Sequence, residues 1–112
     1  MKIFHNPRCR KSRETLQLIE EKGIEPEIIE YLKTPPSKKE LSDILDLLKI
    51  EPQQLLRKNE AIFKSDFKGK ELSNEEWIEA MINNPKLIER PIVVKGGKAI
   101  IGRPPENVKE LF

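Results

Sequence analysis

The chain has 112 residues, of which 36% are charged, and a formal net charge of +2 at neutral pH. This length suits one domain with its own hydrophobic core, so we expect a single domain over residues 1–112. The balanced charge gives no indication of a surface for nucleic acid or anionic membrane. One cysteine cannot form an internal disulfide, and neither a membrane-length apolar run nor a secretory signal pattern is present. We therefore expect a cytoplasmic protein.

The first third of the chain predicts a βαβ unit. Lys2–His5 is short and centred on apolar residues, which is typical of a strand. Lys11–Lys22 has helical periodicity and ends at Gly23, and Glu27–Leu32 predicts a second strand with buried apolar residues. Because a helix connects them, the two strands should be parallel, with a right-handed crossover.

The middle of the chain, residues 37–88, predicts a helical insertion. Ser37–Glu40 and Ser73–Glu76 both have the capping-box spacing that opens a helix, and Glu51-Pro52 starts a short helical turn that runs to Arg57. The second box should open a helix whose buried face is formed by Trp77, Ile78, Met81 and Ile82.

The last part of the chain predicts a β-hairpin and a terminal helix. Strands at Pro91–Lys95 and Lys98–Ile101 flank a Gly-Gly turn, and the helix runs over Pro105–Leu111. The resulting order, βαβ, a helical insertion and ββα, predicts an α/β fold with a thioredoxin-like mixed sheet. Pro91 fits a cis peptide bond at the opening of its strand, or simply the start of an edge strand.

The residues with the greatest capacity for catalysis lie between the first strand and the first helix. Cys9, the only cysteine, sits there among Arg8, Arg10 and Lys11. A helix N-terminus and nearby cations both favour the thiolate, which is the nucleophilic form of cysteine. We therefore expect a reactive Cys9 at the protein surface, against the alternative that a lone cysteine is a small buried hydrophobic residue.

Two neighbours could assist the sulfur. Ser12 lies three residues after Cys9 and could donate its hydroxyl to the thiolate from the first turn of the helix. His5, the only histidine, lies four residues before Cys9 and is either part of the same site or a histidine at a strand end.

Several blocks in order along nearly the whole chain together resemble the ArsC family of glutaredoxin-dependent arsenate reductases and their relatives. The first two of them resemble the branch of the family with an NPRC-x-KSRETL run. The blocks are His5–Cys9, Ser12–Leu16, Tyr31–Pro36, Leu55–Asn59, Asn84-Pro85, Ile88–Val94 and Gly102–Pro104.

The resemblance implies roles for seven residues. Cys9 would be the nucleophile that attacks arsenate, with His5 helping to keep it ionised and Ser12 beside the sulfur. The oxyanion would be held by three arginines, and Pro91 would be the cis-proline of the thioredoxin fold. The three arginines are Arg57, Arg90 and Arg103. Arginine suits this role because its planar, permanently charged group binds oxyanions in a bidentate manner.

The resemblance also implies a reaction in which arsenate is reduced to arsenite. Glutathione would be the co-substrate, and a glutaredoxin would resolve the Cys9–glutathione disulfide. An external thiol is required in any case, because a single cysteine has no internal resolving partner. We expect a monomer with no bound cofactor and no metal.

Two other classes of function stay open at this point. One is a transcriptional regulator of the Spx type that binds RNA polymerase, although those proteins normally carry Cys-x-x-Cys and this chain has Ser12 at the second position. The other is a monothiol, glutathione-linked oxidoreductase without arsenate activity.

Overall fold

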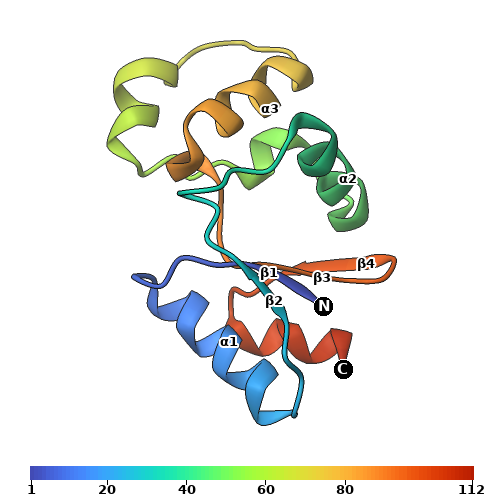
Figure 1. Cartoon of the computed structure of the whole chain (residues 1–112). Helices are drawn as coiled ribbons and strands as arrows, with labels where there is room; N and C mark the ends of the chain where they lie inside the picture. Colours follow the sequence, from blue (N-terminus) through green and yellow to red (C-terminus); the bar gives the residue numbers. More distant parts are fainter. The chain divides into compact units, whose positions relative to one another are not determined.

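The computed structural model describes all residues from Met1 to Phe112. The chain forms two compact units, and we describe each by itself. Residues 1–34 and 90–112 form the first, which we call the sheet unit, and residues 35–89 form the second, the helical unit. The elements are labelled in Figure 1.

The sheet unit contains a four-stranded sheet in the order β2-β1-β3-β4. Its strands are β1 (Lys2–Phe4), β2 (Glu27–Ile29), β3 (Ile92–Lys95) and β4 (Lys98–Ile101). β1 and β2 are parallel, whereas β1 with β3 and β3 with β4 are antiparallel. This confirms the predicted βαβ unit, the hairpin and the thioredoxin-like mixed sheet.

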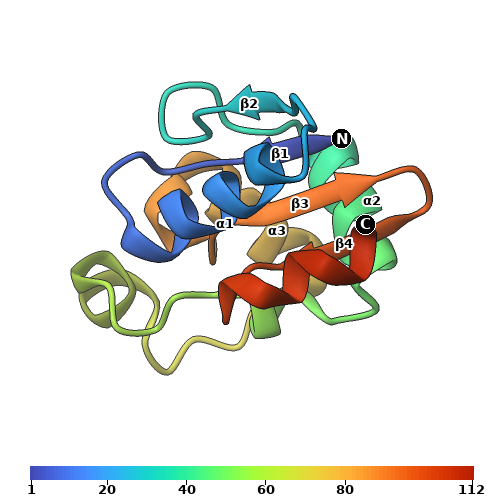
Figure 2. The same ribbon diagram turned by 90° about the horizontal axis from the view of Figure 1, so that it is seen from below.

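Two helices cover one face of this sheet, as Figures 1 and 2 show: α1 (Arg10–Glu21) and η4 (Pro105–Leu111). Apolar residues of the sheet and of both helices form a buried core: Ile3, Ile19, Val93, Val108 and Leu111. The terminal helix is a 3-10 helix, with bonds such as Asn107 N–H to the Pro104 carbonyl at 3.0 Å. At seven residues it is longer than most 3-10 helices, which rarely exceed three or four residues.

The second strand predicted over residues 27–32 is present, but its expected length and burial were wrong. β2 ends at Ile29, and the Lys33 N–H bonds to the Glu30 carbonyl at 2.9 Å in a turn. β2 is an edge strand, so Ile28 is 47% exposed, whereas Tyr31 in the following turn is buried. Adjacent apolar residues therefore marked an edge strand and a buried turn rather than a fully buried strand.

The helical unit contains α2 (Lys38–Leu48), η1 (Pro52–Leu55), η2 (Phe63–Phe67), α3 (Asn74–Asn83) and η3 (Pro85–Leu87). The Ser37 hydroxyl accepts from the Glu40 N–H at the start of α2. At α3 the capping box is complete, because Ser73 accepts from the Glu76 N–H and its own N–H donates to the Glu76 carboxylate. Both predicted helix starts are thus confirmed.

The predicted buried face of α3 was only partly right. Trp77 and Met81 are buried, but Ala80 shares that face, whereas Ile78 and Ile82 are half-buried. A small residue lies where the helix packs closely.

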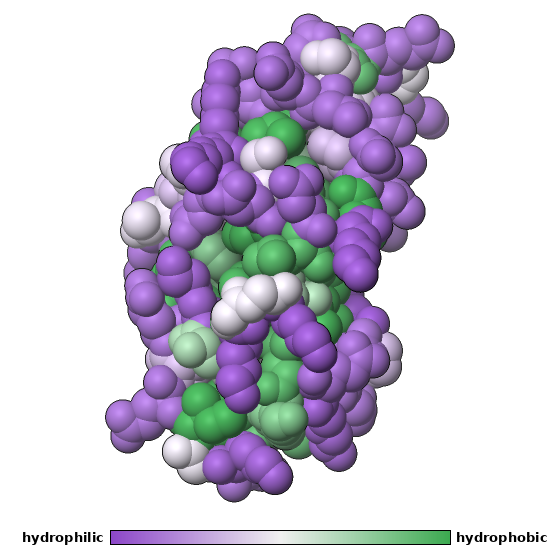
Figure 3. Space-filling view, turned by 90° about the vertical axis from the view of Figure 1, so that its right-hand side faces the viewer, coloured by the Kyte–Doolittle hydropathy of each residue, from purple (hydrophilic) through white to green (hydrophobic).

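No helix is long and apolar enough to cross a membrane. The face shown in Figure 3 is mostly hydrophilic, with smaller apolar areas between the polar side chains.

Candidate active site

Cys9 is the N-cap residue of α1, with extended backbone angles (φ −95°, ψ 122°). Its N–H bonds to the Asn6 carbonyl at 3.0 Å, and its carbonyl accepts the Arg13 N–H at 3.0 Å. Because Cys9 is the N-cap, its sulfur lies at the helix end, where the backbone amides carry partial positive charge. The thiol itself makes no capping hydrogen bond. This confirms that the helix starts beside the cysteine.

The loop that leads into the helix is fixed by two polar contacts that the sequence analysis did not include. The Asn6 side chain accepts from the Arg8 N–H at 3.0 Å, and Arg13 Nη1 donates to the Pro7 carbonyl at 3.0 Å. An asparagine before a proline is a typical signal for such a side-chain turn, so Asn6 could have been recognised. Arg13 gave no comparable signal.

Arg103 is the arginine that the structure places against the sulfur. Its Nη2 lies 3.4 Å from Cys9 Sγ, and its Nε donates to the Arg90 carbonyl at 2.7 Å. The Asn107 amide donates to the Arg103 carbonyl at 3.1 Å and fixes the backbone that carries this side chain. A guanidinium at this distance stabilises a thiolate electrostatically and can also receive an oxyanion.

The backbone that presents Arg103 is packed very closely against α1. A Cβ at Gly102 would lie 2.5 Å from Thr15 Oγ1 and 2.8 Å from Pro91 Cγ, so only glycine fits there. The Gly102 N–H also bonds to the Pro91 carbonyl at 2.9 Å. The peptide bonds Arg90–Pro91 and Arg103–Pro104 are both cis.

His5 and Ser12 form a buried pair next to the cysteine loop. His5 Nδ1 and Ser12 Oγ are 2.6 Å apart, and the Asn6 N–H donates to the same hydroxyl at 3.1 Å. Ser12 therefore bonds to His5 and Asn6, and not to the sulfur, which had been one possible acceptor of its hydroxyl proton. When the neutral imidazole carries its proton on Nε2, the Ser12 hydroxyl donates a hydrogen bond to Nδ1.

Burial lowers the pKa of His5 below the usual 6.5, and the positive charge of Arg13 lowers it further, against the opposite effect of the Glu30 and Glu20 carboxylates. His5 is therefore neutral at pH 7. It contributes a hydrogen bond that positions Ser12, and no positive charge toward the thiol.

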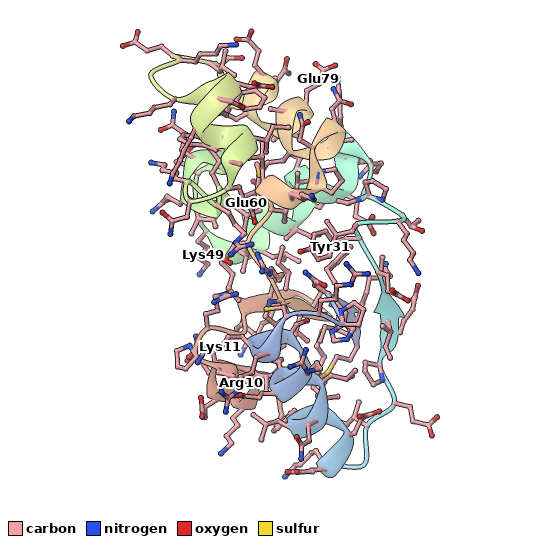
Figure 4. The ribbon with its side chains drawn as sticks, turned by 90° about the vertical axis from the view of Figure 1, so that its left-hand side faces the viewer. Arg10, Lys11, Tyr31, Lys49, Glu60 and Glu79 are labelled. Atoms are coloured by element: carbon pink, nitrogen blue, oxygen red, sulfur yellow. The ribbon has the colours of Figure 1, made fainter.

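The expectation of a surface cysteine was wrong. Cys9 is only 7% exposed, whereas Arg8, Arg10 and Lys11 beside it are all exposed. Figure 4 labels Arg10 and Lys11 at the start of α1. Arg10 is also bonded to the Glu14 carboxylate at 2.9 Å. The charged side chains on either side of Cys9 lie at the surface, whereas Cys9 itself, at the N-cap position, points inward.

For the other two predicted arginines, no contact between the side chain and the sulfur is described. Arg90 lies in the sheet unit and joins the site through its carbonyl, which binds Arg103. Arg57 belongs to the helical unit, where Nη1 lies 2.7 Å from a Glu60 oxygen and Nε 3.5 Å from a Glu89 oxygen. The structure thus brings together Cys9 and Arg103, while oxyanion binding by the Arg57 and Arg90 side chains stays a prediction.

Comparison with known proteins shows to which family the chain belongs. The family model described as the ArsC family matches residues 4–111. The chain belongs to the ArsC family. It is 51% identical to the uncharacterized protein YfgD of Escherichia coli (strain K12), over 99% of this chain and 95% of that one. An arsenate reductase of Haemophilus influenzae is 47% identical, over 98% of this chain and 97% of that one.

A solved structure shows that the fold is shared as well. The arsenate reductase from Vibrio cholerae superposes with a TM-score of 0.94 at 46% identity, covering 99% of this chain and 96% of that chain. The ArsC resemblance and the thioredoxin-like fold expected from the sequence are both confirmed.

Proposed function

We propose that this protein is an arsenate reductase that uses the Cys9 thiolate as its nucleophile. The single observation that carries the proposal is the 3.4 Å contact between Arg103 Nη2 and Cys9 Sγ at the start of α1. It puts a nucleophile and an oxyanion-binding group side by side. The arsenate reductases that match nearly the whole chain support the choice of oxyanion.

The reaction would begin when the Cys9 thiolate attacks arsenic(V), forming a sulfur–arsenic bond while one arsenate oxygen leaves as water after protonation. The thiol of glutathione then supplies the second sulfur. Formation of the Cys9–glutathione disulfide leaves two electrons on arsenic, which departs as arsenite. The balance is one arsenate and two thiols to one arsenite, one disulfide and one water.

A glutaredoxin would then reduce the mixed disulfide and regenerate Cys9. The reason is that the chain has a single cysteine and therefore no internal thiol that could resolve this disulfide. Arg103, anchored to the Arg90 carbonyl through Nε, would bind the arsenate oxygens with its guanidinium group beside the sulfur.

The test is oxidation of NADPH in an assay that couples arsenate reduction to glutathione, glutaredoxin and glutathione reductase. We expect activity in the wild type and none in Cys9→Ser. Arg103→Ala should lower kcat by at least about a hundredfold, as for removal of one oxyanion-binding group. Arg10→Ala is the matched control, because Arg10 also adjoins Cys9 but is exposed and paired with Glu14.

Omitting arsenate separates the competing functions. NADPH oxidation that depends on Cys9 but not on arsenate would replace our proposal with glutathione-linked disulfide exchange. If Arg10→Ala and Arg103→Ala lose activity equally, the general positive charge matters and the specific contact does not. Capture of RNA polymerase by the inactive protein would favour a regulator instead.

A further inference from the structure

The hydrogen bonds that hold the Arg103 backbone extend into the C-terminal helix. Arg103 follows β4 in a short turn, and its own N–H bonds to the Ile101 carbonyl at 2.8 Å. The side chain of Asn107, in the first turn of η4, reaches back to this turn. Figures 1 and 2 show η4, in red, beside α1, the helix that begins next to Cys9.

Both hydrogens of the Asn107 amide group are used in the turn. Nδ2 lies 3.1 Å from the Ile101 carbonyl oxygen and 3.1 Å from the Arg103 carbonyl oxygen. A side-chain amide nitrogen carries two hydrogens, so it can donate to two carbonyls at once. An ionised aspartate of the same shape could donate neither bond. Asn107 therefore joins the two ends of the segment 101–103.

The helix that carries Asn107 is itself anchored at two places. Val108 is fully buried and Leu111 is 5% exposed, and both belong to the core of the sheet unit. The Lys95 ammonium group donates to the Leu111 carbonyl at 2.9 Å, which ties η4 to the hairpin of β3 and β4. A side chain on such an immobile element can hold a neighbouring turn in one geometry.

The turn that Asn107 holds leads directly to the sulfur. The Arg103 side chain donates through Nε to the Arg90 carbonyl at 2.7 Å, and its Nη2 lies 3.4 Å from Cys9 Sγ. The position of the guanidinium group therefore depends on the position of the backbone to which Asn107 is bonded. A displacement of about 1 Å at a reacting centre can lower a rate about a hundredfold, so a small movement of this turn matters.

We propose that Asn107 is a positioning residue of the active site: its two hydrogen bonds keep the Arg103 guanidinium group against Cys9, although Asn107 touches neither the sulfur nor the oxyanion. The inference rests on the proposed function, because it assigns Asn107 a role in the reduction of arsenate. The placement of the guanidinium group, however, can be measured without arsenate.

The measurement compares two alkylating reagents of nearly equal size, the anion iodoacetate and the neutral iodoacetamide. With both, the Cys9 thiolate attacks the methylene carbon, a carbon–sulfur bond forms and iodide leaves. The fraction of ionised thiol is the same for both reagents, so the ratio of the two rate constants reports the charge beside the sulfur. Arg103→Ala should lower the ratio of iodoacetate to iodoacetamide about two- to fivefold, the range for a partly exposed charge pair.

Two variants separate the hydrogen bonds of Asn107 from its packing. Asn107→Leu keeps a similar shape without a donor, whereas Asn107→Gln keeps both donors on a longer side chain. We expect Asn107→Leu to lower the alkylation ratio about twofold, within the effect of Arg103→Ala, and Asn107→Gln to recover part of it. In the arsenate assay, kcat should fall about tenfold in Asn107→Leu and less in Asn107→Gln.

Asn84→Leu is the matched control. Asn84 Nδ2 donates to the Ala80 carbonyl, four residues earlier, at 3.0 Å, and Asn107 makes the same kind of bond to Arg103. Asn84 belongs to the helical unit, so its replacement removes a comparable hydrogen bond elsewhere in the chain. The alkylation ratio of Asn84→Leu should equal that of the wild type, and urea unfolding should show similar stability losses in the two leucine variants.

An alkylation ratio in Asn107→Leu equal to that of the wild type would overturn the proposal. Equal falls of the ratio in Asn107→Leu and Asn84→Leu would also overturn it, because they would reflect lost stability alone. A ratio in Asn107→Gln as low as in Asn107→Leu would show that the two donors are not what matters. If the wild type does not reduce arsenate but the ratio still falls in Asn107→Leu, the proposed function fails and the positioning of Arg103 by Asn107 is supported.

Discussion

Replacing Gly102 with alanine tests whether close backbone packing holds Arg103 against the sulfur. The new Cβ would lie 2.5 Å from Thr15 Oγ1 and 2.8 Å from Pro91 Cγ, and 3.1 Å from Thr15 Cγ2. These are not flexible chain ends, because Thr15 is fully buried on α1 and its hydroxyl donates to the Lys11 carbonyl at 2.8 Å. The segment that carries Arg103 must therefore move.

Overpacking of this kind costs about 1–3 kcal/mol of unfolding free energy. For 112 residues the entropy of unfolding is about 0.24 kcal/mol/K, so the melting temperature should fall by about 4–13 °C. Gly97→Ala is the matched control, because nothing lies within 4 Å of its Cβ position. It should stay within about 0.5 kcal/mol of wild type.

The same variant should weaken the contact between Arg103 and Cys9. The assay is arsenate-dependent NADPH oxidation coupled to glutathione, glutaredoxin and glutathione reductase, and we expect a lower kcat in Gly102→Ala than in Gly97→Ala. Adding Thr15→Ala should restore part of the activity, because two of the three close contacts involve Thr15. Equal stability of Gly102→Ala and Gly97→Ala would refute the packing argument, and an unchanged kcat would refute the positioning of Arg103.

Three further predictions concern other residues. Because burial lowers the pKa of His5, the unfolded chain takes up a proton at a higher pH than the folded chain, so the contribution of His5 to stability is complete above pH 6.5 and falls as the pH drops below it. Urea unfolding at several pH values measures the stability, and NMR titration of the single imidazole measures the pKa of the folded state. An NMR titration midpoint at or above 6.5 would contradict this prediction. Ser12→Ala should lower the free energy of unfolding, measured in urea, by about 1–3 kcal/mol, because it leaves the Asn6 N–H and the His5 imidazole without their buried partner. A loss below about 0.5 kcal/mol would argue against this hydrogen-bond network. Lys49→Gly should stabilise the protein by about 0.5–1 kcal/mol, because Lys49 ends α2 with a left-handed backbone (φ 58°), which glycine adopts without strain. A lower melting temperature than that of the wild type would show that contacts of the Lys49 side chain outweigh this backbone strain.

Local sequence signals predicted much of the fold. The capping box at Ser73 and the Gly-Gly turn after Lys95 each depend on residues a few positions apart, and each is found where the spacing placed it. The end of β2 was missed because its cause is not local: an edge strand can expose Ile28, and the apolar pattern alone does not distinguish an edge from a centre.

The site was less accessible to sequence reasoning. The position of Cys9 at a helix start could be predicted, but its burial could not, because the exposed cations on either side indicate a surface. Arg103 and the glycine before it act through contacts with α1 and Pro91, which only the folded chain brings together. Arg57 was nominated by family resemblance alone, and its partners Glu60 and Glu89 belong to another network.

The contact between sulfur and guanidinium joins positions 94 residues apart along the chain. A growing polypeptide therefore cannot form this contact until Arg103 has been synthesised and its backbone has packed against α1. The N-terminal strand and helix can take up their own local structure earlier, but the pairing of this sulfur with a guanidinium waits for the C-terminal hairpin.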